Sequence, residues 1–273
     1  MPAPESTSGE DDTLELRVPL PPFRAEDYPA PGTEDPPGSG QPGGAGHPPG
    51  SGLPPGSGHP RSAGHPPGAG RPPGTGDIPR PAGHELLGAV AGWGETVTPA
   101  GRLRLLPVRA ERDLALVTAW MNDPAVAALW GLGGPEETTA AHLRAQLDGD
   151  GRSVPCLGLL DGVPMSYWEI YRADLAPLAR HYPARPHDTG LRLLIGAVAD
   201  RGRGIGSCLL RAVSGLVLDN RPSCTRVVAE PDLRNAPSVA AFLRAGFRFS
   251  AEVGIPDRRA ALMMRERSLR DLL

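Results

Sequence analysis

Residues 193–218 read LLIGAVADRGRGIGSCLLRAVSGLVL. The stretch begins with an apolar run typical of a buried strand, continues into a glycine-rich turn and ends in an amphipathic helical pattern. Gly202, Gly204 and Gly206 allow backbone N–H groups to converge on an anion at the positive end of that helix. Taken alone, the pattern fits a phosphate-binding turn and a ligand-free strand–helix connection equally well.

Two better-known phosphate-binding motifs are excluded. The spacing Gly-x-Gly-x-Gly differs from the Gly-x-Gly-x-x-Gly of dinucleotide-binding folds, and no acidic residue follows at the expected distance. A P-loop requires a Lys, and the chain contains none. A phosphate bound at this turn would therefore belong to another class of ligand.

A second motif lies downstream of the turn. It has the spacing Asn-x-x-Ser-x-x-x-Phe-x-x-x-Gly-Phe and consists of Asn235, Ser238, Phe242, Gly246 and Phe247. Together with Arg201-x-x-Gly204-x-Gly206, it resembles the GNAT acyltransferase superfamily over about residues 100–268. The resemblance implies an α/β fold: a single domain with a mixed, mostly antiparallel sheet flanked by helices. It also implies an acyl-CoA cosubstrate bound by Arg201, Gly202, Arg203, Gly204, Ile205, Gly206, Ser207 and Asn235.

Hydrophobic periodicity predicts the elements around these motifs. Helices are expected over 109–122, 136–147, 201–218 (including the turn) and 236–245. Strands are expected over 102–108, 154–160, 164–171, 191–198, 226–229, 247–253 and 259–265. Asp161-Gly162 predicts a tight hairpin between the second and third of these strands.

The N-terminal part has a different composition. The chain holds 36 Gly and 34 Pro, and residues 1–100 contain 20 and 22 of them. Hexapeptide repeats such as HPPGSG and RPPGTG fill residues 41–76. Such a segment cannot bury enough apolar surface to offset its ordering entropy. We therefore expect a disordered region over residues 1–82 and a globular domain over 83–273.

Charge and cysteine content narrow the function further. The net charge of −3 gives no support for nucleic-acid or membrane binding. Cys156, Cys208 and Cys224 lack zinc-site spacing, so no metal is expected.

The acidic N-terminus does not resemble a signal peptide and no apolar run is long enough to span a membrane, which predicts a cytoplasmic protein. The oligomeric state stays open.

A narrower resemblance concerns the acceptor side. The segments AWMNDPAVAALW (119–130), SYWEIYRA (166–173), HDTGLRLLIG (187–196) and AEPDLRN (229–235) resemble siderophore-biosynthetic acyltransferases. That family acylates the hydroxylamine nitrogen of N-hydroxylated lysine, ornithine or cadaverine, so the resemblance implies such a small-molecule acceptor, with acetyl-CoA or succinyl-CoA as donor. It also implies that Asp232 accepts the departing proton. A helix N-cap is the alternative role for this Asp.

The family motif Asp-x-Gly-x-His appears as Asp188-Thr-Gly190-Leu-Arg192. Arg192 stays protonated and cannot act as a base, but its planar fork could hold a carboxylate or hydroxamate oxygen. A salt-bridged strand residue is the alternative interpretation.

Tyr167, Glu169 and Tyr171 alternate along a predicted strand and therefore share one face. We expect them to bind the acceptor, with Glu169 attracting a cationic end. Phe242 stands where many GNAT enzymes carry a proton-donating Tyr, and it has no proton to give.

Two other functions remain open at this point. One is an aminoglycoside-type N-acetyltransferase, whose polycationic acceptor predicts an acidic cleft, whereas these segments carry Arg172, Arg185 and Arg192. The other is a degenerate acyl-CoA-binding module without catalysis, suggested by Arg192 and Phe242.

Overall fold

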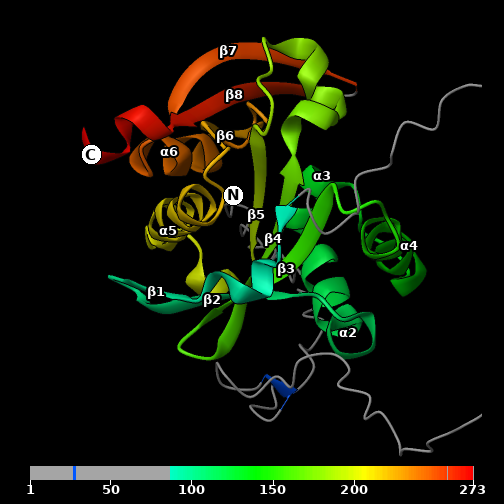
Figure 1. The fold of residues 1–273 in the computed structure, drawn as a ribbon. Helices are drawn as coiled ribbons and strands as arrows, with labels where there is room; N and C mark the ends of the chain where they lie inside the picture. Colours follow the sequence, from blue (N-terminus) through cyan, green and yellow to red (C-terminus); the bar gives the residue numbers. More distant parts are fainter. Residues whose placement is uncertain (1–26, 29–86, 257, 273) are drawn as a thin grey trace, which may run out of the picture. The chain divides into compact units, whose positions relative to one another are not determined.

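The computed structural model describes residues 27–28, 87–256 and 258–272 (Figure 1). The predicted disordered segment 1–82, with its repeats over 41–76, lies outside the described residues except for Asp27 and Tyr28. The Tyr28 hydroxyl donates a hydrogen bond to Asp113 over 3.2 Å, so this tyrosine contacts the globular part.

Eight strands of the described residues form one sheet in the order β1-β2-β3-β4-β5-β6-β8-β7. Every neighbouring pair is antiparallel except β5 and β6, which are parallel. This confirms the predicted mixed, mostly antiparallel sheet. The strands are β1 Glu95–Thr98, β2 Gly101–Pro107, β3 Ser153–Leu160, β4 Val163–Arg172, β5 Thr189–Ile195, β6 Arg226–Ala229, β7 Arg248–Ile255 and β8 Arg258–Glu266.

Helices cover both faces of the sheet (Figure 1). They are α2 Ala110–Met121, α3 Pro124–Trp130, α4 Glu136–Leu147, α5 Ile205–Asn220 and α6 Ala236–Arg244, with short 3-10 helices η2 Val90–Trp93, η3 Ala173–Leu175, η4 Pro177–His181, η5 Val198–Asp200 and η6 Arg267–Leu272. Strand β4 shows the division between the layers. Tyr167 packs in a core with residues of α2, α3 and α4, whereas Trp168 and Ile170 pack in a core with α5.

One predicted strand is displaced, and one helix was not predicted. The strand expected over 191–198 begins at Thr189 and ends at Ile195, because a 3-10 turn, η5, takes over before the glycine-rich turn. Helix α3 was not predicted as an element. Asp123 caps its N-terminus through a hydrogen bond from the Ala125 N–H group, and Gly131 ends it in the left-handed region at φ 66°.

The sheet opens between its two parallel strands. β5 pairs with β4 along its whole length, from Thr189 to Ile195. On its other side, β5 pairs with β6 only at Thr189↔Val227 and Gly190↔Val228. The C-terminal half of β5 therefore diverges from β6, and the gap lies next to the turn that opens α5.

Candidate active site

A cavity of about 180 Å³ lies at this gap. Its lining comes from both helical layers, from β5, from the segment that follows β6 and from the start of β8. The lining residues are Leu129, Trp130, Leu191, Arg192, Leu193, Glu230, Pro231, Asp232, Asn235, Ser238, Phe242 and Arg258. A ligand in this cavity, which we call the gap cavity, can therefore be reached by groups from α3 on one face and α6 on the other.

The glycine-rich turn begins helix α5 without a side-chain cap. Gly202 and Gly204 have φ of 73° and 80°, a region that residues with a Cβ atom rarely adopt. No side chain accepts a hydrogen bond at the N-cap, and the first turn holds no acidic residue. The first backbone N–H groups of α5 are thus open to an anion, which fits the pyrophosphate of acyl-CoA.

The two arginines of the turn differ in their contacts. Arg201 donates to the backbone oxygens of Ile195 and Gly196 over 3.0 and 2.6 Å and pairs with Asp123 over 2.9 Å. Its guanidinium therefore fixes the turn to β5 and α3. The side chain of Arg203 is 67% exposed. Ser207 Oγ donates to the Gly204 oxygen over 2.8 Å, which tightens the first turn of the helix.

Asp232 lines the gap cavity just after β6. Its side chain is only 5% exposed, and its backbone forms an isolated bridge with Ala260. Hydrogen bonds from the side chain and backbone N–H group of Arg234 lower the pKa of this carboxyl below its ordinary value, against the effect of desolvation. Asp232 is not the cap of α6. That position belongs to Asn235, whose Oδ1 accepts from the Ser238 N–H group over 3.1 Å.

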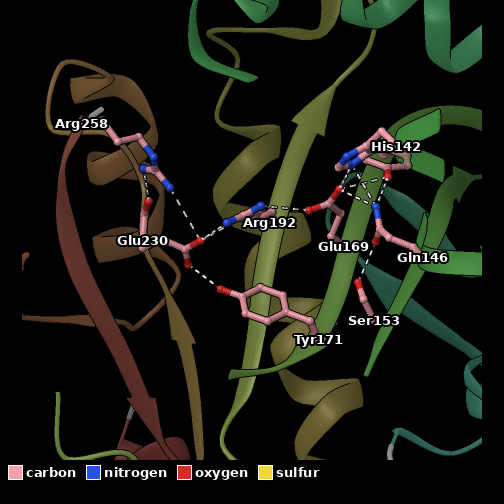
Figure 2. Close-up of polar contacts among 9 residues, drawn as sticks. His142, Gln146, Ser153, Glu169, Tyr171, Arg192, Glu230 and Arg258 are labelled. Carbon is pink, nitrogen blue, oxygen red and sulfur yellow. Dashed lines mark hydrogen bonds and ion pairs between the residues drawn. The ribbon is translucent and has the colours of Figure 1, made fainter. Parts of the chain in front are cut away.

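Arg192 lies between two buried carboxylates (Figure 2). Its Nη2 pairs with Glu230 Oε1 over 2.6 Å, and its Nη1 pairs with Glu169 Oε2 over 3.3 Å. The Glu230 and Glu169 side chains are 1% and 5% exposed, whereas that of Arg192 is 44% exposed. Arg258 adds a second cation, 3.7 Å from Glu230. The guanidinium of Arg192 is thus occupied by side chains of the protein itself.

Tyr171 reaches Glu230 across strand β5. Its hydroxyl donates to Glu230 Oε2 over 2.5 Å (Figure 2). The ring passes over Gly190, its register partner, where a Cβ atom would lie 2.1 Å from the ring. Burial and the neighbouring Glu230 raise the pKa of Tyr171 well above its ordinary value, so its hydroxyl stays protonated as a donor.

Helix α4 contributes two residues that the sequence analysis did not single out. His142 Nε2 lies 2.5 Å from Glu169 Oε1, and Gln146 Nε2 lies 2.9 Å from the same oxygen (Figure 2). Ser153 Oγ donates to Gln146 Oε1 over 2.6 Å and so fixes the amide orientation. Burial raises the pKa of Glu169, but the bond to His142 and the charge of Arg192 outweigh it and lower the pKa overall. The spacing of His142 and Gln146, one helical turn apart, was the available signal.

The other predicted acceptor and donor residues lie as follows. Tyr167 is fully buried, donates to Glu169 Oε1 over 3.2 Å and packs edge-on against Trp130 with ring centroids 5.6 Å apart. It therefore holds the Glu169 carboxylate through a hydrogen bond and does not line the gap cavity. Phe242 lines that cavity and packs edge-on against Phe247 at 5.0 Å.

Two further structural findings bear on function. In the part of the chain that the structure describes, no group of three or more His, Cys, Asp or Glu side chains is placed to hold a metal ion. Within the same residues, no helix combines the length and apolarity needed to cross a membrane.

Comparison with known proteins supplies independent information. A family model described as an acetyltransferase (GNAT) domain matches residues 109–255. The chain is similar to the lysine N-acyltransferase MbtK of Mycolicibacterium paratuberculosis, with 38% identity over 55% of this chain and 67% of the relative. It is also similar to N(6)-hydroxylysine O-acetyltransferase of Escherichia coli, with 36% identity over 57% of this chain and 49% of the relative. N-hydroxyputrescine acetyltransferase of Acinetobacter baumannii is 31% identical over 44% of this chain and 57% of the relative. The chain thus spans about half to two thirds of these relatives.

Solved structures agree on the architecture. An uncharacterized protein of Bacillus halodurans superposes with a TM-score of 0.62 at 31% identity, covering 66% of this chain and 92% of its own. The aminoglycoside acetyltransferase AAC(6')-Ib in complex with coenzyme A superposes with a TM-score of 0.56 at 24% identity, covering 62% of this chain and 98% of its own. The second likeness concerns the fold alone.

Proposed function

The chain belongs to the GNAT acetyltransferase family, and on that premise we propose that it transfers an acyl group from acyl-CoA to the hydroxylamine nitrogen of an N-hydroxylated amine. The product is a hydroxamate, the iron-binding group of hydroxamate siderophores. The names of the relatives from Escherichia coli and Acinetobacter baumannii include hydroxylysine and hydroxyputrescine, respectively. The observation that carries the proposal is the gap cavity, which Asp232 lines together with Arg192 and Glu230.

The donor side is built from backbone groups. The uncapped N-terminus of α5 fits the CoA pyrophosphate, and residues 201–207 are assigned to it. Asn235 already caps α6 through its Oδ1, which leaves its amide N–H groups for the pantetheine. Since Arg201 anchors the turn, its contribution to CoA binding is indirect, whereas Arg203 is exposed and can meet a phosphate.

The chemistry is a direct acyl transfer. The hydroxylamine nitrogen attacks the thioester carbon, the C–N bond forms, and the C–S bond breaks to release the CoA thiolate. The proton leaves the nitrogen for the carboxylate of Asp232. A hydroxylamine is far less basic than an alkylamine, so its nitrogen is neutral at pH 7 and can attack without prior loss of a proton. The lowered pKa of Asp232 keeps this carboxyl ionised at pH 7, so it is able to accept the proton that leaves. The aromatic ring of Phe242 carries no proton, so the thiolate leaves without help from that position.

Arg192 replaces an imidazole of the related enzymes and takes a different role. With Glu169 and Glu230 held on either side, its cation sets the potential at the gap cavity and fixes both carboxylates. We assign it to positioning and substrate binding rather than to proton transfer, because a guanidinium keeps its proton. A binding role toward the acceptor follows from its half-exposed side chain.

The charges argue against a polycationic acceptor. Glu169 and Glu230 are offset by Arg192 and Arg258, so the formal charge of this row is close to neutral. An aminoglycoside carries several ammonium groups and would require an excess of carboxylates.

A CoA-release assay tests the proposal. The protein is incubated with acetyl-CoA or succinyl-CoA and with N-hydroxycadaverine or N6-hydroxylysine, and free thiol is followed over time. We expect turnover with a hydroxylamine and little with the parent amine. Tight CoA binding without turnover of any hydroxylamine would overturn the proposal and favour an acyl-CoA-binding module.

A further inference from the structure

A second cavity lies on the α4 side of Arg192. It has a volume of about 340 Å³ and we call it the α4-side pocket. Arg192 lines both this pocket and the gap cavity, so the two cavities adjoin the same residue. The lining residues are His142, Gln146, Arg152, Ser153, Glu169, Tyr171, Arg172, Leu175, Ala176, Pro177 and Arg192.

One side of this pocket is apolar. Leu175, Ala176 and Pro177 lie on the segment that joins η3 to η4, and the ring of Tyr171 adds a further wall. Leu175 is 41% exposed, so its side chain is accessible at the rim of the pocket. Such walls suit a chain of methylene groups.

The polar end of the pocket is the carboxylate of Glu169, whose two oxygens differ in their partners. Oε1 faces three groups: His142 Nε2 at 2.5 Å, Gln146 Nε2 at 2.9 Å and the Tyr167 hydroxyl at 3.2 Å. Among the residues that the structure describes, Oε2 accepts one hydrogen bond, the long 3.3 Å bond from Arg192. A carboxylate oxygen accepts at least two hydrogen bonds, so Oε2 retains capacity for a donor.

The other charges near the pocket are already paired. Arg152 pairs with Asp150 and Arg172 with Asp174, each over 2.7 Å. Arg192 is shared between Glu169 and Glu230. A cation that enters the pocket therefore meets Oε2 of Glu169 as its acceptor.

We infer that the α4-side pocket binds the end of the acceptor remote from the reacting nitrogen, and that this end is a terminal ammonium on a methylene chain. The ammonium donates to Glu169 Oε2, and the methylene groups lie on the apolar walls. His142 and Gln146 are positioning residues, because they hold Oε1 and thereby orient Oε2. This inference rests on the proposed function, and both an N-hydroxylated diamine and N6-hydroxylysine supply the required group.

The kinetic test compares acceptors with and without the ammonium. N-hydroxycadaverine, N6-hydroxylysine and N-hydroxypentylamine are offered to the wild-type protein, and kcat/KM is measured for each. We expect a preference on the order of tenfold or more for the two ammonium-bearing acceptors, since a hydrogen bond to a charged group is involved. The ratio between the two ammonium-bearing acceptors distinguishes a diamine from an amino acid.

Variants show which residues produce that preference. Glu169→Gln removes the negative charge, and Ala176→Phe fills the pocket without changing Glu169 or Glu230. Each variant is expected to bring the kcat/KM ratio of N-hydroxycadaverine to N-hydroxypentylamine close to one. His142→Gln is expected to raise KM for N-hydroxycadaverine while kcat changes little. Glu252→Gln, an exposed glutamate of β7, is the matched control and keeps the wild-type ratio. A wild-type ratio near one, or one that survives both Glu169→Gln and Ala176→Phe, would overturn the inference.

Direct binding separates this inference from the proposed function. Cadaverine and its neutral analogue 1,5-pentanediol are titrated calorimetrically into the wild-type and Glu169→Gln proteins. Glu169-dependent binding of cadaverine alone supports the pocket even if no hydroxylamine is turned over, in which case only the proposed function fails. Absence of cadaverine binding to a folded wild-type protein would contradict the pocket.

Discussion

The two sides of the gap between β5 and β6 differ in their chemistry, and we propose that they recognise their ligands by different means. On the α5 side, an uncapped helix N-terminus and two left-handed glycines present backbone N–H groups. On the α4 side, the buried carboxylates Glu169 and Glu230 are held around Arg192 by side chains from several elements. The α5 side depends on backbone conformation, whereas the α4 side depends on buried charged side chains. Substitutions should therefore affect donor and acceptor binding separately.

Asp232 lines the gap cavity, and we expect its substitution to have the largest effect, because we propose it as the proton acceptor. Asp232→Asn keeps the shape but removes the proton acceptor, so we expect kcat to fall by about 10²–10⁴-fold. Binding of acyl-CoA, measured by calorimetry, should change little. An Asp232→Asn protein with wild-type kcat would show that the base lies elsewhere.

Gly190→Ala tests the acceptor side. The added Cβ would lie 2.1 Å from the Tyr171 ring and push it away from Glu230. We expect a loss of about 1–3 kcal/mol in the free energy of unfolding. KM for the hydroxylamine should rise several-fold, and KM for acyl-CoA should not. Urea unfolding and steady-state kinetics measure the two effects. An unchanged KM for the hydroxylamine would show that the position of Tyr171 does not matter for acceptor binding.

Gly204→Ala tests the donor side. Its φ of 80° costs an L-residue about 1 kcal/mol or more, so KM for acyl-CoA should rise by up to about tenfold if the turn holds the pyrophosphate. Gly215→Ala is the matched control, because this glycine lies within α5 with nothing within 4 Å of an added Cβ. The control should leave KM unchanged and add up to about 1 kcal/mol of stability. Equal KM values for both variants would contradict the assignment of the turn.

The smallest effect concerns acid stability. The pKa of Glu169 is lower in the folded protein than its ordinary value, so the unfolded state binds more protons as the pH falls through the interval between the two values. The stabilisation from this carboxylate is therefore complete above about pH 4.3 and is lost below it. Urea unfolding at pH 7, 4 and 3 should show a steeper decline for the wild-type protein than for Glu169→Gln. Parallel declines would mean that Glu169 is not stabilised in its charged form.

The α5 side of the site was easier to predict from the sequence than the α4 side. The α5 turn and Asn235 are local in the chain, so their motifs could be read directly and carried the resemblance that assigns them to CoA. The predicted strand–turn–helix context was confirmed. The acceptor side depends on long-range register. Glu169 and Arg192 are register partners on the neighbouring strands β4 and β5, and Arg192 meets Glu230 just beyond the end of β6.

His142 shows the limit most clearly. It lies 27 residues before Glu169, on a mostly polar helix whose buried residues are Thr139 and Leu143. Nothing in its neighbourhood in the chain indicates that α4 packs over β4. Tyr167 was predicted to share a strand face with Glu169, and it does. Its complete burial depends on packing against Trp130, which lies in a helix that was not predicted.

The identity of the product tests the central claim most directly. Wild-type protein is given acetyl-CoA and N-hydroxycadaverine, and the product is examined by mass spectrometry and by its colour with iron(III). We predict a singly acylated product that forms an iron(III) hydroxamate complex, because the acyl group is placed on the hydroxylamine nitrogen. An O-acyl ester, or a product acylated on the distal amine, gives no such complex and would contradict direct transfer to that nitrogen.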